Sequence, residues 1–273
     1  MSWGGWSIEP PVAYVALAGL LYWMGGRGAP ARADDRRRAL CFVAGLASIL
    51  LALDSPIDGA ADKLFWVHML QHVVLLTVSP PLVLLGRPWP RMWRALPLST
   101  RTRGGRAIVR SRAGAPLRRL ARPWPAFVLF NGSLLAWHIP AAYDATLRYG
   151  AIHQIEHAMF FFTGLVFWSR VIDTGPLRPR LTWVGRIAYL AGAMLVGFAL
   201  SLTLVFAAQP IYAHYAALTS RPGGISALAD QQLAAGMMWV PGSISYTIAI
   251  FIAFYRWLEP ERRQASIPAL PTS

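Results

Sequence analysis

Cysteine is almost absent from this chain of 273 residues, which contains only Cys41. One cysteine excludes a disulfide within the chain and a thiolate metal site built on Cys-x-x-Cys. Any metal site must therefore use histidine, methionine, carboxylate or main-chain oxygen. Charge is also scarce: 14% of the residues are charged and 55% are hydrophobic, whereas about a quarter of the residues in a soluble domain are charged. These proportions indicate an integral membrane protein.

Acidic residues are few, 12 against 26 Lys and Arg, which gives a formal net charge of +14. A nucleic-acid-binding protein would gather its basic residues on one soluble face. Here they lie between apolar runs, so we expect a lipid bilayer and no nucleic acid as partner. The segment Met1–Glu9 has no basic n-region and no small-residue cleavage site. We therefore expect it to be a retained extracytoplasmic tail.

Apolar segments alternate with short polar ones along the whole chain. A helix crosses about 30 Å of hydrocarbon at about 1.5 Å per residue, and seven segments are candidates for such spans. They lie near residues 10–26, 37–53, 63–86, 123–139, 150–170, 186–207 and 230–256.

The distribution of Lys and Arg predicts the orientation of these spans. Of the 26 basic residues, 23 lie in alternate segments, and the other side holds only Lys63, Arg148 and Arg221. Basic residues mark the cytoplasmic side. We predict an all-α polytopic protein whose seven-transmembrane-helix bundle covers residues 1–258, with the N-terminus outside and a cytoplasmic tail at 259–273.

The cytoplasmic loop 87–122 contains eleven arginines and is bracketed by Arg-Pro-Trp-Pro at 87–90 and 122–125. Tryptophans at membrane borders and arginines facing anionic headgroups are typical of a lipid anchor. A docking surface for a partner protein is the alternative.

Ser79-Pro80-Pro81 lies within the third predicted span. Proline removes a backbone donor from the helical ladder. We therefore expect a kink on the cytoplasmic side of the histidines in this span.

Two histidine pairs have the i, i+4 spacing that places both imidazoles on one face of a helix. They are His68 with His72 in the third span and His153 with His157 in the fifth. With His138 and His214, all six histidines fall in or beyond the outer half of the predicted bundle. A single histidine at membrane depth often serves as an interhelical hydrogen-bonding group, but two matching pairs favour ligation of a metal or haem. We expect both pairs and His138 to form one cluster.

Other candidate ligands lie close to these pairs in the sequence. Imidazole without thiolate suits copper, zinc or iron, and thioether sulfur favours Cu(I). We consider four methionines as ligands, although methionine in an apolar helix usually only fills the core. Glu156 and Asp54 are expected to orient the ligands, and the other outer acids are expected to be solvated. The methionines are Met69, Met159, Met237 and Met238.

Two other site types use the same residues. The pattern His153-x-x-Glu156-His157 matches the H-x-x-E-H motif of inverted zinc peptidases, which also need a third ligand and an activated water. Haem is the other alternative, although haem is typically held by one histidine from each of two helices rather than by two on one helix. An enzyme of either kind is the minor interpretation, and we expect no catalytic residue.

Taken together, these motifs resemble the multi-spanning CtaG family of cytochrome c oxidase assembly factors, first associated with caa-type oxidases. The resemblance covers about residues 10–258. It rests on Asp54, His68-Met69-x-Gln71-His72 before Ser79-Pro80-Pro81-Leu82, Trp137-His138-x-Pro140, and His153-x-x-Glu156-His157 followed by Phe160 and Gly164.

The resemblance implies a copper-binding membrane chaperone of the respiratory chain in the bacterial cytoplasmic membrane. It would deliver copper to the catalytic subunit of cytochrome c oxidase, with a copper donor protein as a further partner. Zinc, iron and haem stay open as alternatives to copper. A haem or redox protein, and a scaffold whose histidines only pack the bundle, are the alternative functions.

Overall fold

The computed structural model describes residues 10–27, 33–110, 115–120, 122–173 and 181–265. Every regular element within these ranges is a helix, which confirms the all-α class. The expected extracytoplasmic tail, Met1–Glu9, lies outside the described residues, as do residues 266–273 of the expected cytoplasmic tail.

Helices occur at all seven predicted spans, and three of them are long and apolar enough to cross a membrane: Phe65–Leu85, Trp183–Val205 and Ala227–Glu259. The chain is therefore a membrane protein, and the count of seven spans stays a prediction. The helices at the seven positions are α1 (Pro10–Met24), α2 (Asp35–Leu53), the run α4 (Phe65–Val73), η1 (Val74–Val78) and α5 (Ser79–Leu85), α9 (Pro123–Trp137), α11 (Gly150–Trp168), α12 (Trp183–Val205) and α14 (Ala227–Ala265).

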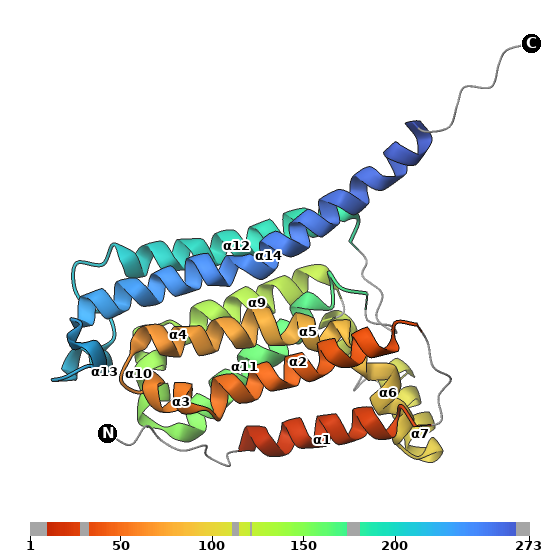
Figure 1. The fold of residues 1–273 in the computed structure, drawn as a ribbon, viewed down its shortest axis with the longest axis horizontal. Helices are drawn as coiled ribbons and strands as arrows, with labels where there is room; N and C mark the ends of the chain where they lie inside the picture. The colour runs from red at the N-terminus through yellow and green to blue at the C-terminus, as the bar shows by residue number, and fades with distance from the viewer. Residues whose placement is uncertain (1–9, 28–32, 111–114, 121, 174–180, 266–273) are drawn as a thin grey trace, which may run out of the picture.

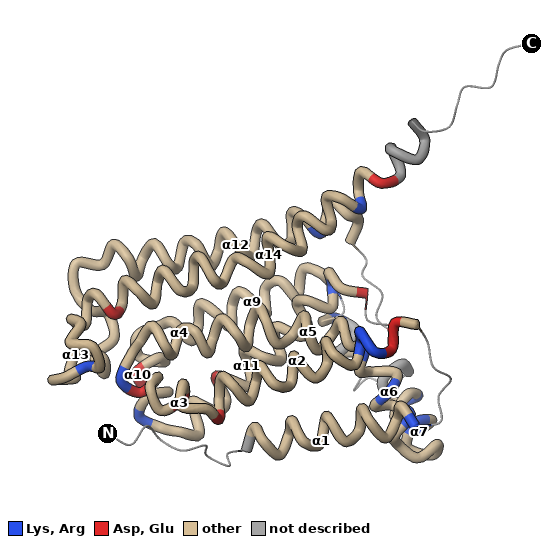
Figure 2. The backbone as a smooth tube through the Cα atoms, viewed as in Figure 1, with Lys and Arg blue, Asp and Glu red and all other residues tan. Residues whose placement is uncertain are grey.

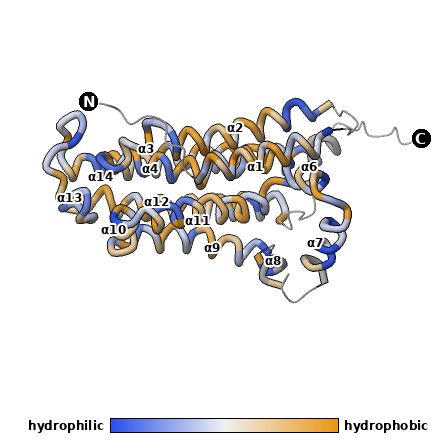
Figure 3. The backbone as a smooth tube through the Cα atoms, turned by 90° about the horizontal axis from the view of Figure 1, so that it is seen from below, coloured by the Kyte–Doolittle hydropathy of each residue, from blue (hydrophilic) through white to orange (hydrophobic). Residues whose placement is uncertain are grey.

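Short helices fill the connections between the long ones. One end of the bundle carries α3 (Pro56–Ala61), α10 (Pro140–Arg148), α13 (Ala213–Ala217) and the turn η3 (Pro222–Gly224). The other end carries α6 (Pro88–Ala95), α7 (Leu98–Arg110) and α8 (Ala115–Leu120), all within the arginine-rich segment. Figure 2 shows basic residues gathered at α6 and α7, and Figure 3 shows the hydrophilic colouring of α7 against the apolar α1 and α2.

The long helices run side by side along one direction (Figure 1). α12 packs against α14, α14 against α4, and α11 against both α9 and α5. Aromatic rings fill the core between α9, α11 and α14: the rings of Phe130 and Phe167 stack with centroids 4.2 Å apart, and those of Trp168 and Tyr246 with centroids 5.3 Å apart.

The regular α-helix of the third predicted span is interrupted beside the prolines, as expected. A π-helical turn, η1, joins α4 to α5. Because Pro80 has no N–H, it cannot donate to the Leu76 carbonyl, and the indole Nε1–H of Trp168 donates to that oxygen instead at 3.0 Å. α11 approaches closely here, since a Cβ added to Gly164 would lie 2.7 Å from Pro80 Cγ.

Candidate metal centre

The structure brings the two histidine pairs together at the end of the bundle opposite the arginine-rich helices. α4 supplies His68 and His72, and α11 supplies His153 and His157. Their imidazole centroids are 4.4 Å apart within the first pair, 4.1 Å within the second, and 4.9 Å between His68 and His153. The two pairs therefore converge, as expected, and each pair occupies one turn of its helix.

Four side chains form what we call the His/Glu cluster: His68, His153, Glu156 and His157. Each offers one ligand atom, and these atoms all lie within 4.8 Å of one another. The Nε2 atoms of His68 and His153 are 3.2 Å apart, and Glu156 Oε2 is 3.9 Å from His68 Nε2. Ligand atoms at such distances can converge on one ion with small side-chain shifts.

Glu156 is the buried acidic residue of this cluster. Its side chain has 0% exposure, and neither of its oxygens accepts a hydrogen bond from any residue that the structure describes. A carboxylate in such surroundings needs a proton or a cation as partner. The nearest basic nitrogen outside the cluster is His72 Nε2 at 3.6 Å. The chemistry of this donor set therefore fits a bound cation.

The hydrogen bonds of His68 determine which of its nitrogens carries the lone pair that a metal would need. The hydroxyl of Tyr215 donates to the Ala61 carbonyl at 2.7 Å, so its single proton is used there. Burial raises the pKa of this hydroxyl, which keeps it protonated. His68 Nδ1, 3.0 Å from the same oxygen, must then be the donor to it. The Nε2 lone pair of neutral His68 therefore points into the cluster.

His138 and His72 lie beside the cluster. His138 ends α9, and its Nδ1 lies 2.7 Å from the Leu134 carbonyl, which can only accept a hydrogen bond. Its Nε2 consequently carries a lone pair, and this atom has no partner among the described residues. Neither nitrogen of His72 has a hydrogen bond there either. The His72 and His138 ring centroids are 6.1 Å apart.

A segment far away in sequence holds the start of α4 in place. The carboxylate of Asp230, at the beginning of α14, accepts hydrogen bonds from the backbone N–H of Phe65 at 2.9 Å and of Trp66 at 3.1 Å. Arg221 lies 3.9 Å from the same carboxylate and donates to the Tyr215 carbonyl. The expectation that Asp230 is solvated is wrong, because it is fully buried and supplies the acceptors that a helix N-terminus lacks.

The four candidate methionines occupy different surroundings. Met69 is fully buried and Met238 is partly buried, and both line a cavity that also contains His72 and His138. Met159 is 37% exposed, and Met237 packs into the apolar cluster around Phe65. Neither Met159 nor Met237 lines that cavity.

Asp54 is buried at the C-terminal end of α2. Its expected role in orienting a ligand stays a prediction. Asp58, expected to be solvated, is only partly exposed, and its carboxylate accepts a hydrogen bond from Gln71 Nε2 at 2.8 Å. The same Nε2 also donates to the Ala52 carbonyl. Through these two bonds, Gln71 connects the middle of α4 to α2 and α3, directly beside His72 in the sequence.

Several groups that shape the site carried no signal in the sequence. Tyr143 of α10 and Tyr212 before α13 are buried against Phe65 and each other, with the two tyrosine centroids 4.1 Å apart. Tyr215 and Asp230 act on α4 from more than 140 positions away. The i, i+3 spacing of Tyr212 and Tyr215 could have marked one buried face of α13, but it could not have named a histidine as partner.

Comparison with known proteins agrees with the motifs. A family model described as "Cytochrome c oxidase caa3 assembly factor (Caa3_CtaG)" matches residues 13–260. Uncharacterized proteins of Mycobacterium bovis and Mycobacterium tuberculosis are each 27% identical to this chain over 235 residues, and one of Mycobacterium leprae is 24% identical over 231. Each alignment covers 84% of this chain but 35% of the relative, so the chain spans about a third of these curated relatives.

No solved structure matches the chain. The family match extends over nearly all the described helices, from α1 to α14, and includes every histidine of the site. The resemblance seen in the motifs is thereby confirmed: this chain belongs to the Caa3_CtaG family of cytochrome c oxidase caa3 assembly factors.

Proposed function

We propose that this protein binds copper at the His/Glu cluster and delivers it to the catalytic subunit during maturation of cytochrome c oxidase. The observation that carries the proposal is the buried Glu156 carboxylate without a hydrogen-bond partner, beside three imidazoles whose ligand atoms lie within 4.8 Å of it and of one another. Imidazole suits copper, and the near absence of cysteine excludes a thiolate cage.

The donor set favours an ion over haem. Ring centroids of neighbouring histidines lie 4.1–4.9 Å apart. A haem ligated by two histidines would need its macrocycle between the two rings, whereas His68 and His153 are in direct contact through Nε2. The assembly-factor family also favours a non-enzymatic role over a zinc peptidase.

The topology belongs to the same proposal. Seven helices cross the bacterial cytoplasmic membrane with the arginine-rich helices on the cytoplasmic side and the cluster on the other. Copper would then be handled at the outer face, where a copper donor protein would load it. Figure 2 supports this arrangement, since α6 and α7 lie at the end of the bundle opposite α10 and α13.

The test is metal analysis of the purified full chain after expression with copper. We expect copper in the unmodified protein and its loss in a variant with His153→Ala and His157→Ala. His214→Ala is the matched control, because His214 contacts Tyr215 rather than the cluster histidines. An anomalous scattering peak among the cluster residues would locate the ion. Copper at background in the unmodified protein, or unchanged in the double variant, would contradict the proposal. Zinc in place of copper would redirect it, and a Soret band would favour haem.

A further inference from the structure

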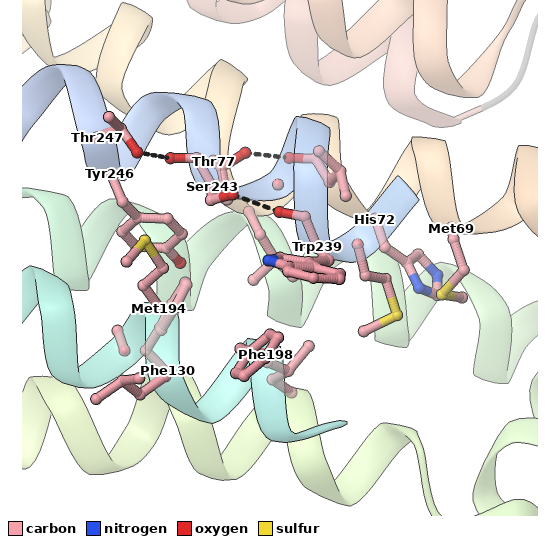
Figure 4. A pocket seen from close by; sticks show the side chains of 18 of the residues that line it. Met69, His72, Thr77, Phe130, Met194, Phe198, Trp239, Ser243, Tyr246 and Thr247 are labelled. Carbon is pink, nitrogen blue, oxygen red and sulfur yellow. Dashed lines mark hydrogen bonds between the residues drawn. The ribbon is translucent and has the colours of Figure 1, made fainter. Parts of the chain in front are cut away.

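A cavity of about 370 Å³ lies next to the His/Glu cluster, between α4, α9, α12 and α14 (Figure 4). His72 and His138 form part of its wall and are 2% and 5% exposed, whereas Leu195 and Trp239, also in its wall, are 61% and 48% exposed. The cavity wall therefore includes both exposed side chains at the surface of the bundle and two buried imidazoles. Its volume is ample for an ion and its ligands.

The polar groups of the wall are unevenly satisfied. The hydroxyls of Thr77, Ser243 and Thr247 donate to carbonyls of their own helices, as Figure 4 shows, and are not available to a ligand as donors. The Nε2 of His138 and both nitrogens of His72 have no hydrogen bond among the described residues. Among the buried side-chain nitrogen and oxygen atoms of the described wall residues, these imidazole nitrogens are the ones without a hydrogen bond.

Thioether sulfur is the other ligand type in this wall. Met69 lies beside His72, and Met194 lies farther along the cavity near Tyr246 (Figure 4). Two contacts between α14 and α4 place Met238 near the level of His72. Asp230 of α14 accepts a hydrogen bond from Phe65 at the start of α4. Gly242, one helical turn after Met238, lies beside Val73, since a Cβ on Gly242 would be 3.6 Å from a Val73 methyl. Two thioethers and two imidazoles therefore line the same cavity.

We propose that this cavity is a second metal site, selective for Cu(I), with His72 and His138 as nitrogen ligands and Met69 and Met238 as sulfur ligands. Thioether with imidazole in apolar surroundings suits a soft monovalent ion. The inference rests on the proposed function and adds a path to it. His72 belongs to both places, because its Nε2 lies 3.6 Å from Glu156 Oε2. Copper passes between the cavity and the His/Glu cluster through this imidazole as Cu(I), with no change of oxidation state.

The first experiment adds Cu(I) anaerobically to the full chain in detergent and records copper content and X-ray absorption at the copper edge. We expect sulfur as well as nitrogen neighbours in the unmodified protein. Met69→Leu with Met238→Leu, which nearly conserves volume, should remove the sulfur neighbours and the copper of the cavity while the cluster keeps its copper. Met159→Leu with Met237→Leu is the matched control and should change neither, because these two methionines do not line the cavity.

The outcomes separate the two proposals. Copper bound by nitrogen and oxygen alone in the unmodified protein, or sulfur neighbours that persist in the Met69/Met238 variant, would overturn the cavity site and leave the cluster proposal standing. An absence of copper from the unmodified protein would overturn both. If the cavity takes up only detergent or lipid chains, copper in the unmodified protein will have nitrogen and oxygen neighbours but no sulfur, and the cavity site is overturned.

A plug in the cavity tests the path. Gly197 lies in the cavity wall, and a Cβ added there would meet no atom within 4 Å. We expect Gly197→Phe to fill the cavity and slow the loading of the cluster by Cu(I) severalfold without lowering its final copper content. Gly236→Phe is the control, since Gly236 has equal space but lies outside the cavity wall. An unchanged loading rate in Gly197→Phe would contradict the path.

Discussion

At the scale of single residues, one tyrosine hydroxyl orients the site. Because the Tyr215 hydroxyl donates its hydrogen bond to the Ala61 carbonyl, its oxygen accepts from His68 Nδ1, and the lone pair of His68 Nε2 is directed at His153 within the cluster. A partner on the second ring nitrogen is a general device for fixing the tautomer of a ligating histidine. The proposed metal site thus depends on a residue that is not one of its candidate ligands.

The substitution Tyr215→Phe tests this role. It keeps the aromatic ring packed near Phe65 and removes only the hydroxyl. We expect copper affinity to fall by about 10- to 100-fold, the range typical for partners of ligating histidines, as measured by competition with a chromophoric chelator. Tyr149→Phe is the control because Tyr149 is 60% exposed. Equal affinities in the two variants would show that Tyr215 only packs.

Asp230 gives the second prediction at this scale. Asp230→Ala removes both acceptors from the N-terminal N–H groups of α4 and leaves Arg221 without its carboxylate. Loss of such a cap costs about 0.5–2 kcal/mol of stability. Because Asp230 is buried, we expect the loss in Asp230→Ala to lie toward the upper end of this range. Thermal unfolding in detergent measures it. Asp34→Ala is the control, since Asp34 precedes α2 without a side-chain cap bond; equal melting temperatures would exclude the capping role.

At the scale of helices, some of the site followed from spacing and some did not. The i, i+4 pairs placed two imidazoles on one face of α4 and of α11. The same geometry separates the methionines: Met159 is about 200° around the helix from His157, whereas Met69 is about 60° from His72. Helical phase could therefore have predicted that Met159 faces away. The packing of α4 beside α11 could not, because no local pattern specifies which helices are neighbours.

The segment between α12 and α14, together with the first turn of α14, was the least predictable part. Tyr212 and Tyr215 of this segment and Asp230 of α14 reach across the bundle end to α4 and α10. Such contacts depend on tertiary packing, and an acid in a polar loop reads as solvated until its partner helix is known. Pro80, by contrast, acts on its own helix, so the interruption at η1 was predictable.

The junction of α11 with this interruption gives a prediction about packing. A Cβ at Gly164 would lie 2.7 Å from Pro80 Cγ and 3.2 Å from the Leu76 carbonyl. We expect Gly164→Val to force the two helices apart and to destabilise the fold by about 1–3 kcal/mol, as overpacking does. Thermal unfolding again measures this. Gly132→Val carries the same helix propensity change with no atom within 4 Å, so equal losses in both variants would show that packing is not the cause.

At the scale of the whole molecule, charge and ligands are separated along the bundle. The arginine-rich helices α6 and α7 lie at one end, and α10 and α13 lie at the other, close to the histidines (Figure 2). Of the 26 basic residues, 23 belong to segments predicted to be cytoplasmic. This separation is what links the position of the cluster to a side of the membrane.

Reporter fusions test that link in bacterial cells. Since basic segments are retained in the cytoplasm, a fluorescent protein fused after residue 273 should fluoresce, and alkaline phosphatase inserted at Gly223, in the turn η3, should be active because that enzyme matures only outside the cytoplasm. Phosphatase inserted at Gly105, in the arginine-rich α7, is the control and should be inactive. Active phosphatase at Gly105 with none at Gly223 would place the histidines on the cytoplasmic side. Copper binding would survive that result, but delivery of copper at the outer face would not.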